Sequence, residues 1–188
     1  MTTGSPMADI DEFRLVRVLG QGGMGSVYLG YDTVLERDVA IKLIGRQRAT
    51  DPDAHQRFLT EARAIARLAH PNVISIFRAS TTTDGHAYIV QELIRGQSLD
   101  RVELPIEPRR VIAIALGVAR GLAAAHRRGI LHRDVKPGNV MLDEAGVPKL
   151  LDFGIAKLDR PTAPARARIV RADTSPVDLA ATLDAPLA

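Results

Sequence analysis

Short apolar runs divide the first half of the chain into five predicted β-strands. The clearest run covers residues 38–44, where Val39, Ile41 and Leu43 share one face and Ala40 and Lys42 share the other. The other runs are rich in β-branched and aromatic residues and are bounded by turn-forming residues. They predict strands at residues 13–19, 26–29, 73–79 and 87–92, and two later strands at 140–142 and 149–151.

Two longer stretches have the period of an α-helix. Residues 52–69 carry one apolar face and stop before a His-Pro dipeptide; that face consists of Phe58, Glu61, Ile65 and Leu68. Residues 108–128 are apolar on nearly all sides, with one stripe formed by Val111, Ala115, Val118 and Leu122. We therefore expect the second helix to be buried on most sides, as the core of a second lobe.

Two charged residues lie where an unpaired charge would be costly. Lys42 is inside an apolar strand, and Glu61 is on the apolar face of the first helix. An ion pair between Lys42 and Glu61 would resolve both problems. The alternative is that Glu61 only flanks the apolar face and is solvated.

A glycine-rich segment separates the first two predicted strands. Residues 20–27 read GQGGMGSV, with the spacing G-x-G-x-x-G-x-V. Dinucleotide-binding folds use a similar spacing, but there the glycines open a helix, whereas a strand-like segment follows here. The pattern favours a hairpin tip whose backbone N–H groups approach phosphate oxygens. A plain glycine hairpin is the alternative.

Residues 132–139, HRDVKPGN, place a carboxylate, an ammonium and a carboxamide within one short segment. It contains Asp134, Lys136 and Asn139, and the sequence Asp152-Phe153-Gly154 follows it. A carboxylate can accept a proton, an ammonium can neutralise an anion, and the oxygens of Asn139 and Asp152 can bind a metal ion. These groups suit transfer of a phosphoryl group, although a solvated loop with ordinary charges is the alternative reading.

Composition narrows the classes of protein further. The chain has 188 residues, of which 46% are hydrophobic and 25% charged, so we expect a soluble globular protein. It has no cysteine, which fits the reducing cytoplasm and excludes disulfides. The net charge of +3 suits an anionic ligand, but the basic residues are scattered, so we expect no nucleic-acid binding. No apolar run is long enough to span a membrane, and the N-terminus has no signal-peptide pattern.

Taken in order, the motifs resemble those of the bacterial, eukaryotic-like serine/threonine protein kinases. The resemblance covers about residues 13–157 and rests on GQGGMGSV, VAIK, Glu61, HPN, HRDVKPGN and DFG. It implies an α+β, bilobal, protein-kinase-like fold. Residues 13–94 would form an N-lobe with a five-stranded antiparallel sheet and one helix, and residues 95–157 a mainly helical, incomplete C-lobe. Residues 1–12 would be a flexible lead-in and 158–188 a disordered tail rich in Ala, Pro and Arg.

The resemblance also implies an ATP-dependent kinase that phosphorylates Ser or Thr of a protein substrate, with Mg²⁺ or Mn²⁺ as the metal. It makes Asp134 and Lys136 catalytic and Asn139 and Asp152 the metal ligands. The residues implied to bind the nucleotide are Leu19, Gly20, Gly22, Gly25, Val27, Ala40, Lys42, Glu61, Glu92, Ile94 and Met141. Backbone groups of Glu92 and Ile94 would meet the adenine edge. Ile65, Ile76, His132 and Phe153 match the stacked column that links the two lobes.

The chain departs from the family pattern after Lys157. The activation segment ending in Ala-Pro-Glu and the later helices of the large lobe are missing, so we expect a truncated lobe with exposed apolar area on the helix at 108–128. A homodimer or a partner kinase would cover that area. Two alternatives to an active kinase remain: a catalytically silent, nucleotide-binding or regulatory fragment, and a non-functional gene remnant.

Overall fold

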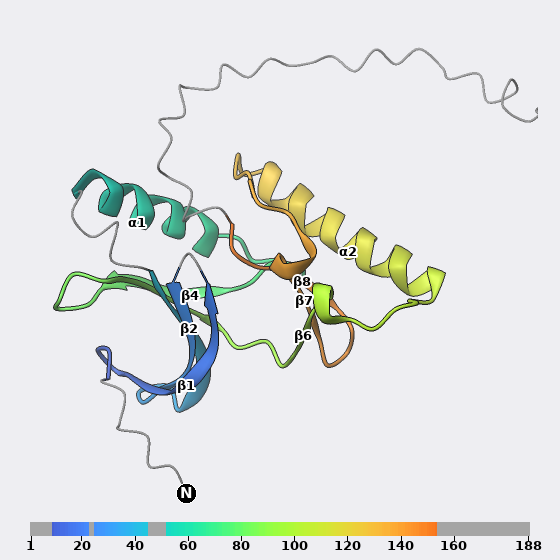
Figure 1. Cartoon of the computed structure of the whole chain (residues 1–188). Helices are drawn as coiled ribbons and strands as arrows, with labels where there is room; N and C mark the ends of the chain where they lie inside the picture. Colours follow the sequence, from blue (N-terminus) through green and yellow to red (C-terminus); the bar gives the residue numbers. More distant parts are fainter. Residues whose placement is uncertain (1–8, 23–24, 45–51, 154–188) are drawn as a thin grey trace, which may run out of the picture.

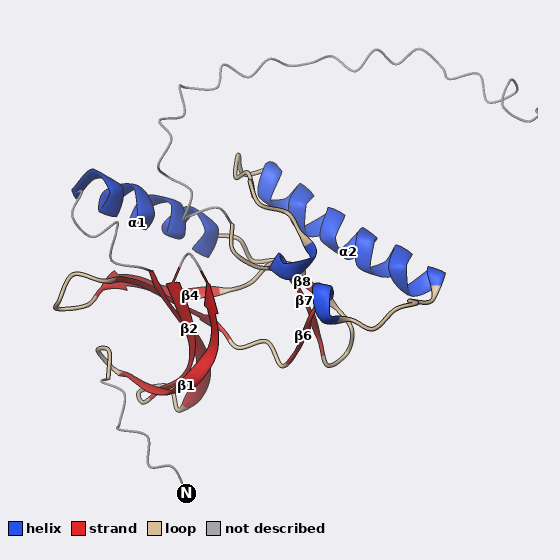
Figure 2. Ribbon diagram, viewed as in Figure 1, coloured by secondary structure: helices blue, strands red, loops and turns tan. Residues whose placement is uncertain are grey.

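The computed structural model describes residues 9–22, 25–44 and 52–153. A five-stranded sheet with helix α1 on one side forms the first part, and helix α2 with a small second sheet forms the other (Figure 1). Adjacent strands of each sheet pair antiparallel, and helices and strands are segregated, as Figure 2 shows. This is the α+β arrangement that the resemblance implied.

The large sheet confirms the five predicted strands. They are β1 (Phe13–Gly22), β2 (Gly25–Asp32), β3 (Arg37–Ile44), β4 (Ile76–Thr81) and β5 (Ala87–Glu92), in the order β1-β2-β3-β5-β4. β4 begins at residue 76 and not at 73, because the preceding segment pairs elsewhere. Ile74 N–H donates to Leu150 O at 3.0 Å, so residues 73–75 connect the large sheet to the second part of the molecule.

Part of the predicted flexible lead-in is fastened to the large sheet. Ile10 is buried beside Phe13, and Thr33 N–H donates to Glu12 O at 3.1 Å. Arg78 on β4 forms ion pairs with Asp11 and Glu12. Local sequence could not indicate these ion pairs, because Arg78 lies more than 60 residues from Asp11 and Glu12 along the chain. Residues 1–8 lie outside the described residues, as do Gly154 and the tail predicted at 158–188.

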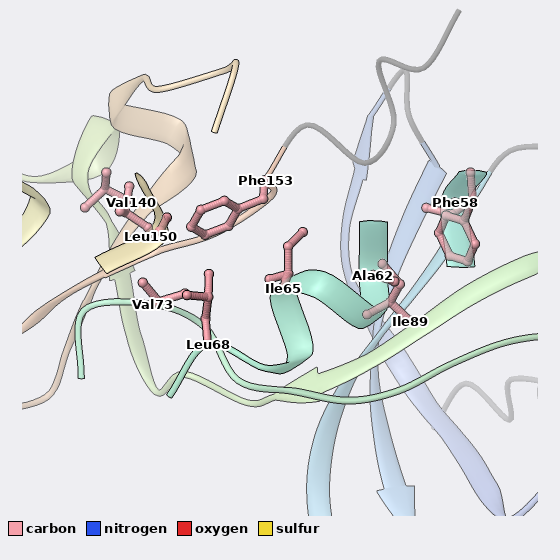
Figure 3. Packing of buried hydrophobic residues seen from close by; sticks show 11 residues of the cluster. Phe58, Ala62, Ile65, Leu68, Val73, Ile89, Val140, Leu150 and Phe153 are labelled. Carbon is pink, nitrogen blue, oxygen red and sulfur yellow. The ribbon is translucent and has the colours of Figure 1, made fainter. Parts of the chain in front are cut away.

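Helix α1 (Pro52–Ala66) organises the main apolar core. Its buried residues Phe58, Ala62 and Ile65 belong to one cluster with residues of both sheets: Ile44, Leu68, Val73, Ile89, Ala125, Val140, Leu150 and Phe153. Figure 3 shows this cluster extending along α1, from Phe58 near the large sheet to Val140 and Leu150 in the small one. The core is therefore continuous between the two parts, and it fixes how they meet.

Helix α2 (Pro108–His126) lies against the small sheet of β6 (Gly96–Ser98), β7 (Val140–Asp143) and β8 (Pro148–Leu150). Short 3-10 turns at Leu99–Arg101 (η2) and Pro137–Asn139 (η3) flank this sheet. The Glu107 side chain caps the start of α2 by accepting a hydrogen bond from Arg110 N–H at 3.2 Å, and Pro108 occupies the first helical position. No helix among the described residues is long and apolar enough to cross a membrane.

Helix α2 is buried on one side, and not on most sides as predicted. The helix buries its small side, which consists of Ile114, Gly117, Gly121, Ala124 and Ala125. Of the apolar residues expected inside, Val111 and Leu116 are each 47% exposed and Ile112 is 66% exposed. Periodicity finds an apolar helix but cannot tell which side meets the sheet; close approach to Asn72 and Pro148 selects the glycine side. The exposed apolar area agrees with the expectation that α2 lacks part of its cover.

Gly121 is required by that close approach. A Cβ at this position would lie 2.7 Å from Asn72 O and 2.9 Å from Leu150 Cδ1. We therefore expect Gly121→Ala to lower the free energy of unfolding by about 1–3 kcal/mol, although alanine has the better helix propensity. Urea unfolding measures this, with Ala119→Gly on the exposed side as the control for propensity alone. A more stable Gly121→Ala variant would contradict this packing.

Candidate active site

A cleft of about 730 Å³ lies between the large sheet and the small sheet. That volume is in the range of small-molecule sites. Eight of the predicted site residues line it: Leu19, Gly20, Val27, Ala40, Glu92, Ile94, Met141 and Asp152. The small side chain of Ala40 on β3 and the apolar side chain of Met141 on β7 both face the cleft, so a flat ring can fit between the two sheets.

Sequence reasoning missed other apolar residues of the cleft. Leu29, Ile74 and Leu151 line it. The period of two residues along β2 puts Leu29 on the same face as Val27, so that signal was available. Ile74 had no such signal, because it lies in the segment that joins α1 to β4.

The glycines of the first hairpin serve two different purposes. Gly20 and Gly22 have no atom within 4 Å of an added Cβ, which leaves open space for a ligand. Gly25 has φ of +130°, and its Cβ would lie 1.9 Å from Leu43 O, so glycine is needed there to pack on β3. Gly22 and Gly25 do not line the cleft, and Gly23 and Met24 lie outside the described residues. Binding of phosphate by this loop stays a prediction.

The segment after β5 presents backbone groups to the same cleft. Glu92 N–H already donates to Ser75 O at 3.0 Å, so this donor is not available to a base. Ile94 makes no backbone hydrogen bond within the described part of the chain. Ile94 is therefore the better candidate for a donor to adenine.

The catalytic candidates form one hydrogen-bonded cluster. Lys136 Nζ donates to Asp134 Oδ2 at 3.0 Å. Asn139 is buried, and its Nδ2 donates to Asp134 O at 2.8 Å and to Asp134 Oδ2 at 3.0 Å. Because the nitrogen of the Asn139 amide is used in this way, its oxygen is the atom that can bind a cation. The structure thus brings together Asp134, Lys136 and Asn139, as predicted.

His132 joins this cluster to the segment that carries Asp152. Its Nε2 lies 2.7 Å from Leu151 O, and Asp134 N–H donates to Nδ1 at 3.4 Å, which makes Nε2 the protonated nitrogen. Burial lowers the pKa of His132, although the hydrogen bond to Leu151 and nearby carboxylates oppose this effect. Its ring centroid lies 4.6 Å from that of Phe153 with the rings tilted by 40°, so these two members of the predicted column are in contact. Arg133 and Asp152 have positive φ angles of 62° and 49°, and such conformations occur often at functional sites.

The predicted ion pair between Lys42 and Glu61 is wrong for this structure. Lys42 Nζ lies 2.5 Å from Asp152 Oδ1, and Glu61 Oε1 lies 3.4 Å from Arg133 Nη1. Burial raises the pKa of Glu61, and the charge of Arg133 acts against that. Helical period placed Glu61 correctly beside the core but could not choose between two cations. Glu61 consequently borders a small cavity with Arg133 and Phe153, outside the main cleft.

The residues present are compatible with a divalent metal ion held together with a nucleotide. Among the described residues there is no group of three or more His, Cys, Asp or Glu that could hold a metal ion. Asn139 and Asp152 would offer one amide oxygen and one carboxylate. Magnesium is commonly bound by one or two carboxylates together with the phosphates of a substrate, so this donor set is sufficient. The contact of Asp152 with the Lys42 ammonium shows that its carboxylate already attracts a cation.

Known proteins match this chain along most of its length. Serine/threonine-protein kinase PknB of Mycolicibacterium smegmatis is 39% identical over 163 residues, which are 84% of this chain and 26% of that protein. Serine/threonine-protein kinase PrkC of Bacillus subtilis is 38% identical over 147 residues, 77% of this chain and 22% of that protein. The crystal structure of the Mycobacterium tuberculosis PknI kinase domain matches with a TM-score of 0.72 and 32% identity, covering 82% of this chain and 63% of that one.

This chain spans about a quarter of the length of the curated relatives that it matches. The family model described as "Protein kinase domain" matches residues 13–172, which extends past residue 157, where the recognisable motifs end. The N-lobe sheet, the helix α1 and the ordered motifs agree with this match. The chain belongs to the protein kinase family.

Proposed function

We propose that this chain carries the catalytic site of a serine/threonine protein kinase, which transfers the γ-phosphoryl group of ATP to a Ser or Thr hydroxyl of a protein. Protein kinases use ATP and a divalent metal ion. The observation that carries the proposal is the contact of Lys42 with Asp152 at the cleft, next to the cluster of Asp134, Lys136 and Asn139.

The nucleotide roles follow from the cleft. Adenine lies between Ala40 and Met141, with its edge at the segment of Glu92 to Ile94. Leu19, Gly20, Val27 and, by resemblance, Gly22 and Gly25 cover the nucleotide. Lys42 neutralises phosphate charge, whereas Glu61 pairs with Arg133 and has no role at the nucleotide. Asn139 and Asp152 would hold the divalent metal ion, magnesium or manganese, because both residues offer oxygen ligands that suit either ion.

The reacting groups have distinct tasks. The hydroxyl oxygen of the acceptor forms a bond to the γ-phosphorus, the bond from that phosphorus to the ADP oxygen breaks, and the proton of the hydroxyl passes to Asp134. Lys136, 3.0 Å from Asp134 Oδ2, neutralises charge on the transferred group. The metal, when bound, neutralises charge on the phosphates. The rate enhancement therefore comes from positioning the reacting groups and from stabilising the charge on the transferred phosphoryl group.

The remaining parts of the proposal concern organisation. We assign residues 13–94 to an N-lobe and 95–157 to a partial C-lobe. A cytoplasmic site of action is proposed because ATP is found there. A second copy or a partner kinase that covers the exposed side of α2 remains a prediction, supported by the exposure of Val111, Ile112 and Leu116.

The test is transfer of radiolabel from γ-labelled ATP to a generic basic protein, followed by identification of the labelled amino acid. We expect label on Ser or Thr, and none when the divalent ions are chelated. Binding of MgATP without any transfer would instead favour the silent, regulatory fragment. A chain that neither binds MgATP nor unfolds cooperatively would favour the gene remnant.

A further inference from the structure

A network of three residues borders the adenine side of the cleft, and its side-chain contacts are not explained by any role above. Lys149 Nζ on β8 lies 2.5 Å from Glu92 Oε1 at the end of β5, and both side chains are about one-fifth exposed. The other carboxylate oxygen, Glu92 Oε2, accepts a hydrogen bond from Ser75 N–H at 3.0 Å. We call Ser75, Glu92 and Lys149 the hinge clip.

The hinge clip joins three separate segments of the chain. Ser75 belongs to the connection from α1 to β4, Glu92 ends β5 in the large sheet, and Lys149 lies in the small sheet. Backbone bonds reinforce the junction, because Glu92 N–H donates to Ser75 O at 3.0 Å and Leu150 N–H donates to Asn72 O at 2.9 Å. Burial acts to raise the pKa of Glu92, but the hydrogen bonds from Lys149 and Ser75 outweigh it, so that its pKa is lowered and the carboxylate is ionised.

Lys149 lies close in the chain or sheet to residues at both ends of the nucleotide site, the adenine end and the metal end. Lys149 pairs across the small sheet with Met141, which forms the apolar floor of the cleft. Three residues further along the same chain is Asp152, which borders the cleft and contacts Lys42. Strand β8 and the two residues after it therefore carry both the tie to Glu92 and the proposed metal ligand.

We propose that Glu92 and Lys149 are positioning residues for the nucleotide: their ion pair sets the segment Glu92–Ile94 at the correct distance from Asp152, so that adenine and the phosphates are bound at the same time. This inference rests on the proposed nucleotide-binding function. The Glu92 side chain acts through its own backbone and through Lys149, and neither side chain needs to touch the nucleotide. A ligand that has phosphates but no adenine does not require this distance to be fixed.

The test compares two ligands on the whole chain, MgATP and magnesium tripolyphosphate, by titration calorimetry. In Lys149→Met and in Glu92→Gln, we expect the Kd of MgATP to rise about tenfold, as it would if the binding-competent arrangement were populated about one-tenth of the time. The Kd of magnesium tripolyphosphate should change less than twofold. Lys149→Arg keeps the charge and the donor, so it should retain the MgATP affinity of the wild type.

Three other results would overturn either the positioning role or the proposed function. Unchanged MgATP affinity in both Lys149→Met and Glu92→Gln overturns the positioning role. Equal weakening of MgATP and tripolyphosphate also overturns it, because a general loss of structure would have that effect. Failure of the wild-type chain to bind MgATP overturns the proposed function itself. Because Glu92→Gln is isosteric and keeps an acceptor for Ser75 N–H, it decides the question if Lys149→Met does not fold.

Discussion

Asp134→Asn is expected to lower the rate of phosphoryl transfer by about 10³-fold while leaving the Kd of MgATP within about twofold. The substitution keeps the size of the side chain and an oxygen that can accept hydrogen bonds from Lys136 and Asn139. It removes only the ability to take up the proton of the acceptor hydroxyl. Initial rates of label transfer, with nucleotide binding measured in parallel, provide the check.

The matching control is Asp100→Asn. Asp100 also lines the cleft, but it lies outside the predicted catalytic and metal-binding set. We expect its transfer rate to stay within about tenfold of the wild-type rate, because it contributes only local contacts. If Asp134→Asn kept a transfer rate similar to that of Asp100→Asn, Asp134 would not be the proton acceptor.

Asp152→Asn should lower the rate of phosphoryl transfer by a similar factor, because it weakens metal binding. Asp152 is the only carboxylate of the two proposed metal ligands, and its loss removes the charge that attracts the cation. We expect the Mg²⁺-dependent part of ATP affinity to disappear and the transfer rate to fall by about 10³-fold. The measurement is ATP binding as a function of magnesium concentration.

Asp152→Asn also removes the partner of Lys42, whose side chain is only 10% exposed. A buried ammonium without a partner destabilises the fold, so thermal unfolding must show that the variant is folded at the assay temperature. A folded variant whose ATP affinity still rises with magnesium as in the wild type would show that Asp152 is not a metal ligand.

Local pattern was sufficient for the parts of the fold that depend on local chemistry. The alternation along β3 placed Ala40 and Lys42 on one side, and both reach the cleft or its charged border. The Pro-Gly dipeptide of residues 132–139 predicted a loop, and the structure has the 3-10 turn η3 there. Asn139, the last residue of η3, is buried against Asp134. Such features follow from neighbouring residues, which is why sequence reasoning could find them.

The failures concern choices between distant partners. The helical period correctly placed Glu61 beside the core, but it could not identify the partner of Lys42. Lys42 pairs with Asp152, which is 110 residues away along the chain. The strand β6 was missed because its three residues, Gly96–Ser98, carry no apolar pattern and are held only by pairing with β7. Lys149 gave no signal in the sequence, because its partner Glu92 is on another sheet. Tertiary contacts, and not propensity, decide these cases.

The most direct test of the account is an experimental structure with magnesium and a non-hydrolysable ATP analogue. The account predicts adenine between Ala40 and Met141, phosphates at Lys42, and a magnesium ion about 2.1 Å from oxygens of Asp152 and Asn139. An analogue bound at another surface, or a metal ion without either ligand, would contradict it.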